Sequence, residues 1–199
     1  MSNQPVDQSR RTWVTIACIA GGAGGVATAV PFVSTFQPSE RARAAGAAVE
    51  ADISALKPGE MMTVEWRGKP VWIVRRTPEQ LAALDKIANE LVDPKSERKP
   101  SELTPEYARN VHRSIKPEYL IAVGICTHLG CSPSSKFQAG PQASLPDNWP
   151  GGFLCPCHGS TFDLAGRVFK NKPAPDNLEI PPHMYLSDTK ILIGEDKKA

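Results

Sequence analysis

Two short segments in the second half of the chain constrain it most, because each places a thiol close to an imidazole. They read Cys126-Thr-His128-Leu-Gly-Cys131 and Cys155-Pro-Cys157-His158-Gly-Ser160. Thiols and imidazoles are the protein ligands of zinc ions and of some iron–sulfur clusters. A metal site built from both segments requires a fold that brings them together.

The ligand set favours iron. Two cysteines with two histidines are found in Rieske [2Fe–2S] centres, where two imidazoles replace two thiolates on one iron. We expect Cys126 and Cys155 to bind the inner iron, and His128 and His158 to bind the outer iron. Because neutral imidazoles remove negative charge, such centres reach roughly −150 to +300 mV. Each imidazole also keeps an N–H, so an electron and a proton can be taken together, which suits the oxidation of a hydroquinone.

A structural zinc site is the alternative, since two cysteines and two histidines also bind zinc. Zinc sites usually pair Cys-x2–4-Cys with His-x3–5-His, whereas each segment here mixes the two residue types. Cys131 and Cys157 are left over, one in each segment. We expect these two cysteines to form a disulfide that ties the segments together.

The two segments closely resemble the cluster loops of the Rieske iron–sulfur subunits of bacterial quinol:cytochrome c oxidoreductases, respiratory complex III. The resemblance extends over nearly the whole chain, through an N-terminal anchor, a hinge, a β-rich domain and a Pro-rich loop after the second segment. It implies a mainly β fold: a Rieske antiparallel β-sandwich with one helical insertion and a rubredoxin-like cluster-binding subdomain at about 124–170. It also implies one [2Fe–2S] cluster as the cofactor.

The residues beside the ligands carry further expectations. Gly130 and Gly159 lack a Cβ, which lets backbone amides approach the cluster sulfides. High-potential members of the family usually follow Cys-His-Gly with a Ser and, two residues later, a Tyr, and both donate hydrogen bonds to sulfur. Ser160 is present, but Phe162 occupies the second position and lacks the hydroxyl. Lys172 precedes Pro-Ala-Pro, where the family usually has Gly, so the local turn of the Pro-rich loop can differ.

The resemblance implies an electron-transfer role in an enzyme. The subunit would oxidise ubiquinol at the quinol-oxidation site of a cytochrome b subunit and pass the electron to a c-type cytochrome subunit, with proton release into the periplasm. His158 would be the exposed ligand that hydrogen-bonds the quinol hydroxyl and accepts its proton. Leu129 would be an apolar docking contact. Family resemblance also suggests a dimeric complex.

The N-terminal part predicts a membrane anchor. No residue from Trp13 to Phe36 is charged, and the stretch is long enough to span a bilayer as one helix. Arg10 and Arg11 precede it, a pair that resembles a twin-arginine export signal and favours a cytoplasmic N-terminus. The expected disulfide requires the oxidising periplasm, so we expect a single-pass protein of the bacterial inner membrane. The predicted parts are a cytoplasmic tail at 1–11, a transmembrane anchor in lipid at 12–36, a flexible hinge at 37–50 and a periplasmic Rieske domain at 51–199.

The head domain shows β patterns and one helix signal. Alternating runs at Glu60–Trp66 and Val71–Arg75 predict a hairpin. Thr77 predicts a capped helix start, because Pro78 follows it directly and Gln80 lies three residues after it. Apolar residues at helical spacing then continue to Leu91. We expect an irregular spacer at 132–153 and further strands at 119–124, 166–170, 178–180, 184–186 and 191–193.

Other functions fit less well. A net charge of +2 with 22% charged residues does not suggest binding to nucleic acid. A plastoquinol-oxidising complex uses a related subunit, but that counterpart tends to be smaller around 78–115. A periplasmic arsenite-type oxidase also has an exported Rieske subunit, which works beside molybdenum and needs no mobile hinge. The membrane span and the additional cysteine pair argue against a Rieske ferredoxin or oxygenase domain.

Overall fold

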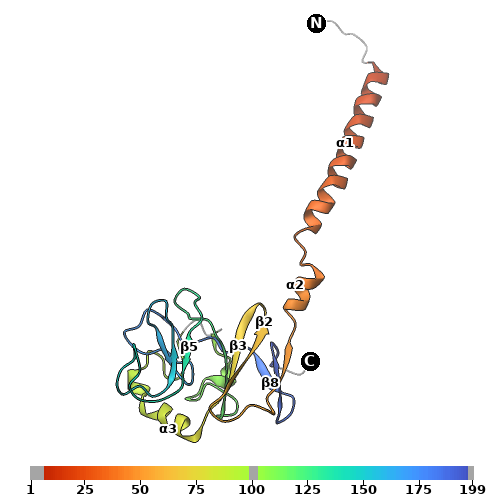
Figure 1. The fold of residues 1–199 in the computed structure, drawn as a ribbon. Helices are drawn as coiled ribbons and strands as arrows, with labels where there is room; N and C mark the ends of the chain where they lie inside the picture. Colours follow the sequence, from red (N-terminus) through yellow and green to blue (C-terminus); the bar gives the residue numbers. More distant parts are fainter. Residues whose placement is uncertain (1–6, 99–102, 197–199) are drawn as a thin grey trace. The chain divides into compact units, whose positions relative to one another are not determined.

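The computed structural model describes residues 7–98 and 103–196 (Figure 1). The chain divides into two compact units, Met1–Ala44 and Ala45–Ala199. Each unit is described by itself.

The first unit consists mainly of helix α1, Gln8–Ser34. The carboxylate of Asp7 caps this helix by accepting the backbone N–H groups of Ser9 and Arg10. With 27 residues, α1 is about 40 Å long, and its length and apolar composition suit a membrane span. It is followed by the short helix α2, Glu40–Ala45, within the segment predicted as a hinge.

The second unit is mainly β, as predicted. Its described residues form three antiparallel sheets of three strands each. The first sheet has the order β1-β9-β8, with bounds Val49–Asp52, Lys190–Ile193 and His183–Tyr185. The second has the order β2-β3-β4, with bounds Met61–Trp66, Lys69–Arg75 and Tyr119–Val123. The third has the order β5-β6-β7, with bounds Ser134–Lys136, Gly152–Leu154 and Thr161–Asp163.

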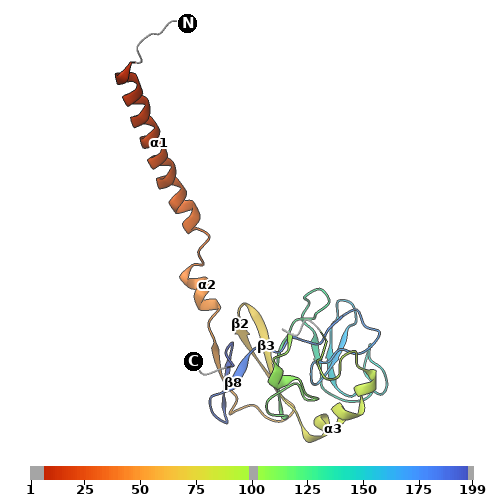
Figure 2. The ribbon, with the colours of Figure 1, turned by 180° about the vertical axis from the view of Figure 1, so that it is seen from behind.

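The β2-β3-β4 sheet lies between the other two, as Figures 1 and 2 both show. Successive side chains of a strand point to opposite faces, and β3 and β4 bury both faces. Val71 and Ile73 pack in a core with residues of β1 and β9. Trp72 and Val74 pack on the opposite face in a core with residues of β6 and β7. The middle sheet therefore serves two hydrophobic cores.

The predicted hairpin and helix start are confirmed. β2 and β3 pair through a two-residue turn in which Arg67 and Gly68 have φ of 53° and 70°, a geometry that matches the twist of a hairpin. Thr77 and Gln80 form the predicted capping box at the start of α3, Pro78–Lys86. The helix ends earlier than the apolar spacing predicts, because Leu91 is extended and pairs with Phe169.

Some predicted strands are wrong. Residues 166–170 form only isolated bridges, and 178–180 belong to no strand, although Leu178 and Ile180 are buried. The stretch 132–153, predicted to be irregular, contains β5 and the start of β6. Shortly after Thr104 lies one short 3-10 helix, Glu106–Ala108.

Candidate metal centre

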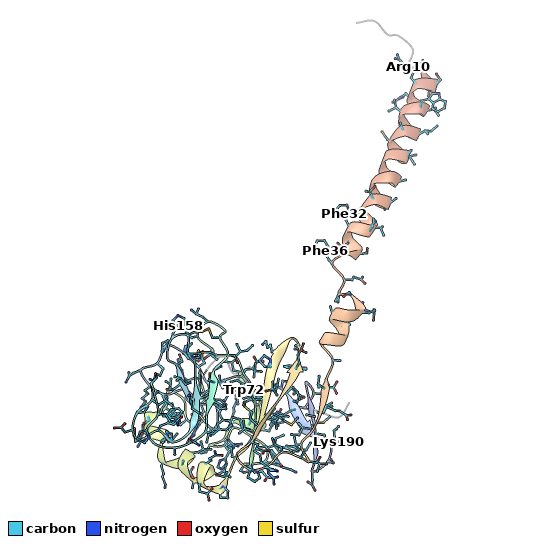
Figure 3. The ribbon with its side chains drawn as sticks, viewed as in Figure 1. Arg10, Phe32, Phe36, Trp72, His158 and Lys190 are labelled. Carbon is cyan, nitrogen blue, oxygen red and sulfur yellow. A yellow bond between two sulfur atoms is a disulfide. The ribbon has the colours of Figure 1, made fainter. Side chains whose placement is uncertain are left out.

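The two cysteine–histidine segments are loops attached to neighbouring sheets. The first follows β4, and the second connects β6 to β7. Figure 3 shows His158 at one edge of the head unit, with Trp72 in the interior between it and Lys190. The third sheet therefore presents the second loop at the surface of the head.

Both loops fold with the same backbone hydrogen bonds. In the first, the N–H of Gly130 donates to the carbonyl of Cys126 (3.0 Å), and the N–H of Cys126 donates to the carbonyl of Cys131 (2.8 Å). In the second, the corresponding bonds join Gly159 to Cys155 (3.0 Å) and Cys155 to Ser160 (2.8 Å).

This shared turn explains the glycines. Gly130 and Gly159 have φ of 83° and 74°, the left-handed region that side chains disfavour. A Cβ on either would meet no protein atom within 4 Å, so backbone conformation alone accounts for both glycines. Their close approach to cluster sulfides stays a prediction. The turn also places exposed Leu129 in the position that exposed His158 occupies in the other loop.

The two predicted thiol ligands are buried together. Cys126 and Cys155 are each 2% exposed and belong to the same apolar core. Burial and the neighbouring Cys155 thiol raise the pKa of Cys126, whereas hydrogen bonds from the His128 backbone N–H and from Ser160 oppose this rise. Thiolates at both positions therefore need a cation between them, which is what an iron ion supplies.

The two predicted imidazole ligands lie beside each other in the loops that carry these thiols, with His158 exposed and His128 partly buried. The ring centroids of His128 and His158 are 4.8 Å apart, with an interplanar angle of 88°. Nδ1 of His128 is buried and has no hydrogen-bond partner among the described residues. A buried polar atom without a partner is costly, and coordination of a metal by this nitrogen would remove that cost. Buried thiols, converging imidazoles and this unpartnered nitrogen fit a [2Fe–2S] cluster.

The predicted disulfide between Cys131 and Cys157 is present and joins the two loops. The sulfur atoms of Cys131, Cys155 and Cys157 all lie within 4.8 Å of one another. Two of these sulfurs are bonded to each other and have no thiolate to offer, so this sulfur triad is not itself a metal site. The bridge instead closes the loops directly beside one of the predicted thiol ligands.

The Pro-rich loop is hydrogen-bonded to both cluster loops. The hydroxyl of Thr127 donates to the carbonyl of Asp176 (2.6 Å). The backbone N–H of Ala174 donates to Oγ of Ser160 (3.0 Å). Lys172, which departs from the family pattern, is exposed and outside these contacts.

Phe162 is a core residue. It is fully buried on β7 opposite Phe153, whose ring stacks on Trp72 with centroids 4.8 Å apart. The same core contains Cys126 and Cys155. The position therefore lies close to the thiol ligands but contributes no hydroxyl donor.

Comparisons with known proteins agree with this geometry. The Rieske [2Fe–2S] domain family matches residues 95–182. The ubiquinol-cytochrome c reductase iron-sulfur subunit of Allochromatium vinosum is 60% identical over 198 residues, covering 99% of this chain and 94% of the relative. The Rhodospirillum rubrum protein of the same name is 41% identical, covering 94% of this chain and 93% of the relative.

A solved structure, a hyperthermophilic respiratory complex III, contains a chain that is 26% identical with a TM-score of 0.46, covering 89% of this chain and 97% of the solved one. That overall superposition is too loose to add to the sequence relatives. The domain match itself decides between the two metals, and the structural zinc site is not supported.

Proposed function

Because this chain belongs to the family of Rieske iron–sulfur subunits of ubiquinol–cytochrome c reductase, we propose that it oxidises ubiquinol at the quinol-oxidation site of cytochrome b. It then passes the electron to a c-type cytochrome, and protons are released into the periplasm. Cytochrome b and cytochrome c1 are the partners that a complex III subunit implies. Assembly of the whole complex as a dimer is part of the proposal.

One observation carries the proposal: two imidazoles meet in the loops that carry two buried thiols. Cys126 and Cys155 would hold the inner iron, and His128 and His158 the outer iron. When bound, the [2Fe–2S] cluster supplies a one-electron acceptor of high potential. The buried thiols keep the inner side away from water, whereas exposed His158 is accessible to a substrate.

His158 and Leu129 would have different roles at the docking surface, proton transfer and apolar contact. After losing its N–H proton, the outward nitrogen of His158 would accept a hydrogen bond from the quinol hydroxyl and then take the quinol proton, which restores the N–H. Leu129 is 72% exposed, unusually open for a large apolar side chain beside a reactive centre. It would make apolar contact with the cytochrome b surface.

The N-terminal unit would anchor the subunit. α1 is long and apolar enough to cross the membrane once, with Arg10 and Arg11 at its start. We place this end in the cytoplasm and the head in the periplasm, where the disulfide can form and persist. The segment predicted as the hinge, 37–50, would let the head move between its two partners, except that its last two residues, Val49 and Glu50, are held in β1 by pairing with β9.

Substitution of the ligands in the complete complex tests the proposal. His158→Asn and Cys126→Ser should abolish both the Rieske electron paramagnetic resonance signal and ubiquinol–cytochrome c reductase activity. His112→Asn is the matched control, because His112 lies outside both loops and should leave both signals intact. Immunoblotting checks that each variant subunit still assembles with haem b and haem c. A normal g-tensor in His158→Asn would refute the ligand assignment, and a native complex with molybdenum but no haem b would refute the function.

A further inference from the structure

The head unit buries more positive than negative charge. Among the described residues, the buried charged side chains are Arg76 at 2% exposure and Arg113, Arg167 and Asp163 at 0%. Three guanidinium groups and one carboxylate leave two positive charges in excess. Charged side chains are rarely buried unless they are paired, so this excess needs an explanation.

The single acid is hydrogen-bonded to one arginine, Arg167, although its charge also opposes the lowering of the pKa of Arg76 and Arg113 by burial. Nε of Arg167 donates to Asp163 at 2.7 Å, and the carboxylate also accepts the backbone N–H groups of Ala165 and Arg167. Among the described residues, Arg76 and Arg113 make their hydrogen bonds to other groups and not to this carboxylate. One carboxylate thus faces three guanidinium groups, and two positive charges remain in excess.

Arg76 and Arg113 are held by neutral oxygens. Arg76 donates to four backbone carbonyls and one hydroxyl, those of His112, Leu164, Pro117, Tyr119 and Ser114. Arg113 donates to three backbone carbonyls and one hydroxyl, those of Ala165, Gly166, Leu178 and Thr104. Burial lowers the pKa of Arg76 to about 10 and that of Arg113 to about 9. Both groups stay protonated at neutral pH.

Hydrogen bonds connect these charges to the segment that follows the second cluster loop: Arg76 donates to the Leu164 carbonyl, and Arg113 to those of Ala165 and Gly166. Ser160 is bonded to Cys155, and Asp163 follows three residues later on β7, roughly 10 Å along the strand. Leu178, whose carbonyl accepts from Arg113, packs in the same apolar core as Cys126 and Cys155. Buried Leu178 therefore connects Arg113 to the core that contains the thiol ligands.

We propose that the buried positive charge of Arg76 and Arg113 raises the midpoint potential of the cluster. Reduction adds one negative charge, which nearby positive charge stabilises, and buried charges are screened much less than exposed ones. The inference rests on the proposed cluster ligands but extends beyond them, since neither arginine is near enough in sequence to belong to a cluster loop. At an effective dielectric constant of about 20 and a charge separation of roughly 12–25 Å, each arginine would change the reduction equilibrium about three- to tenfold, and a tenfold change is about 59 mV.

Redox titration of the complete complex, followed by electron paramagnetic resonance near pH 7, tests the proposal. Arg113→Gln and Arg76→Gln should each lower the midpoint potential, whereas Asp163→Asn should raise it, because it removes the opposing charge. Arg109→Gln is the matched control. It removes the same charge from an exposed side chain of the same insertion, and we expect a shift at least threefold smaller in the equilibrium constant.

The opposite signs separate electrostatics from structural damage. Loosened packing would shift the arginine and Asp163 variants in the same direction, and this outcome overturns the proposal, as do unchanged potentials. If one arginine variant yields no cluster signal, the other arginine variant and Asp163→Asn decide between the same two outcomes. If His158→Asn loses the signal while the charge variants keep it, the ligand assignment stands. Unchanged potentials in the charge variants then count against the charge effect alone.

Discussion

The β2-β3-β4 sheet and the β5-β6-β7 sheet share a core but are stabilised by different interactions. The first has strands of five to seven residues with apolar side chains on both faces. The second has strands of three residues each and depends on a disulfide, left-handed glycines and side chains that bond to backbone. The metal-binding region is thus stabilised at a few points, which leaves its ligands near the surface. The neighbouring sheet supplies the rigid support.

A cavity in the supporting sheet should affect stability alone. Ile73 is fully buried on the face away from the cluster loops, so Ile73→Ala should lower the free energy of unfolding by about 2–5 kcal/mol. The midpoint potential should not change. Chemical denaturation and redox titration of the same preparation check both parts, and a changed potential would show that the two sheets are not separable in function.

Removal of the disulfide should affect both properties. Cys131→Ser opens the bridge between the loops, and a native bridge typically contributes about 2–4 kcal/mol. We therefore expect an unstable subunit that loses its cluster, although neither cysteine binds iron. Denaturation and iron content report this loss. Ready alkylation of Cys131 and Cys157 in the native oxidised protein would contradict the bridge.

A hydroxyl added near the thiol ligands should affect the potential by a smaller amount. Phe162→Tyr restores a donor that the chain lacks, and such donors stabilise the more negative reduced cluster. A hydrogen bond to a charged group is worth about 1.5–3 kcal/mol, and the difference between redox states is smaller, about 1 kcal/mol. The midpoint potential should therefore rise by about 40 mV.

Ser160 provides the matched opposite case, because its side chain already bonds to Cys126. Ser160→Ala should lower the potential by a similar amount or more. If Phe162→Tyr produces no upward shift in a redox titration, the residue at 162 serves packing only.

The smallest effect should be a pH dependence that belongs to the β1-β9-β8 sheet, outside both compared sheets. His183 on β8 is 1% exposed, and burial lowers its pKa below the ordinary value of 6.5, against the opposing bond to the Pro181 carbonyl. The unfolded chain then binds this proton more readily. The contribution of buried, neutral His183 to the stability of the folded protein is complete above pH 6.5 and is lost as the pH falls through the folded pKa.

Unfolding free energies measured between about pH 7 and pH 5 check this sign. His183→Gln should flatten the dependence relative to the unaltered protein. Equal slopes in the two proteins would show that His183 does not titrate on unfolding.

The sequence predicted the β2-β3-β4 sheet better than the β5-β6-β7 sheet. Alternating apolar residues identified the β2-β3 hairpin, and Thr77 identified the start of α3, because these signals act within a few residues. The strands β5 and β6 escaped prediction, since three-residue strands have too little alternation to detect. Residues 178–180 had strand-like character, but their backbone bonds to Leu103, Val123 and Gly166 instead of to one neighbouring strand.

Residue chemistry alone favoured iron over zinc and identified the four candidate ligands and the disulfide partners, because few residue types bind iron and their spacing is specific. Only the tertiary structure decided how the Pro-rich loop bonds to both cluster loops and that Arg76 and Arg113 are buried. From the sequence alone, an arginine is expected to lie at the surface. Burial became possible here because carbonyl groups from distant segments converge on each guanidinium, and such convergence exists only after the chain has folded.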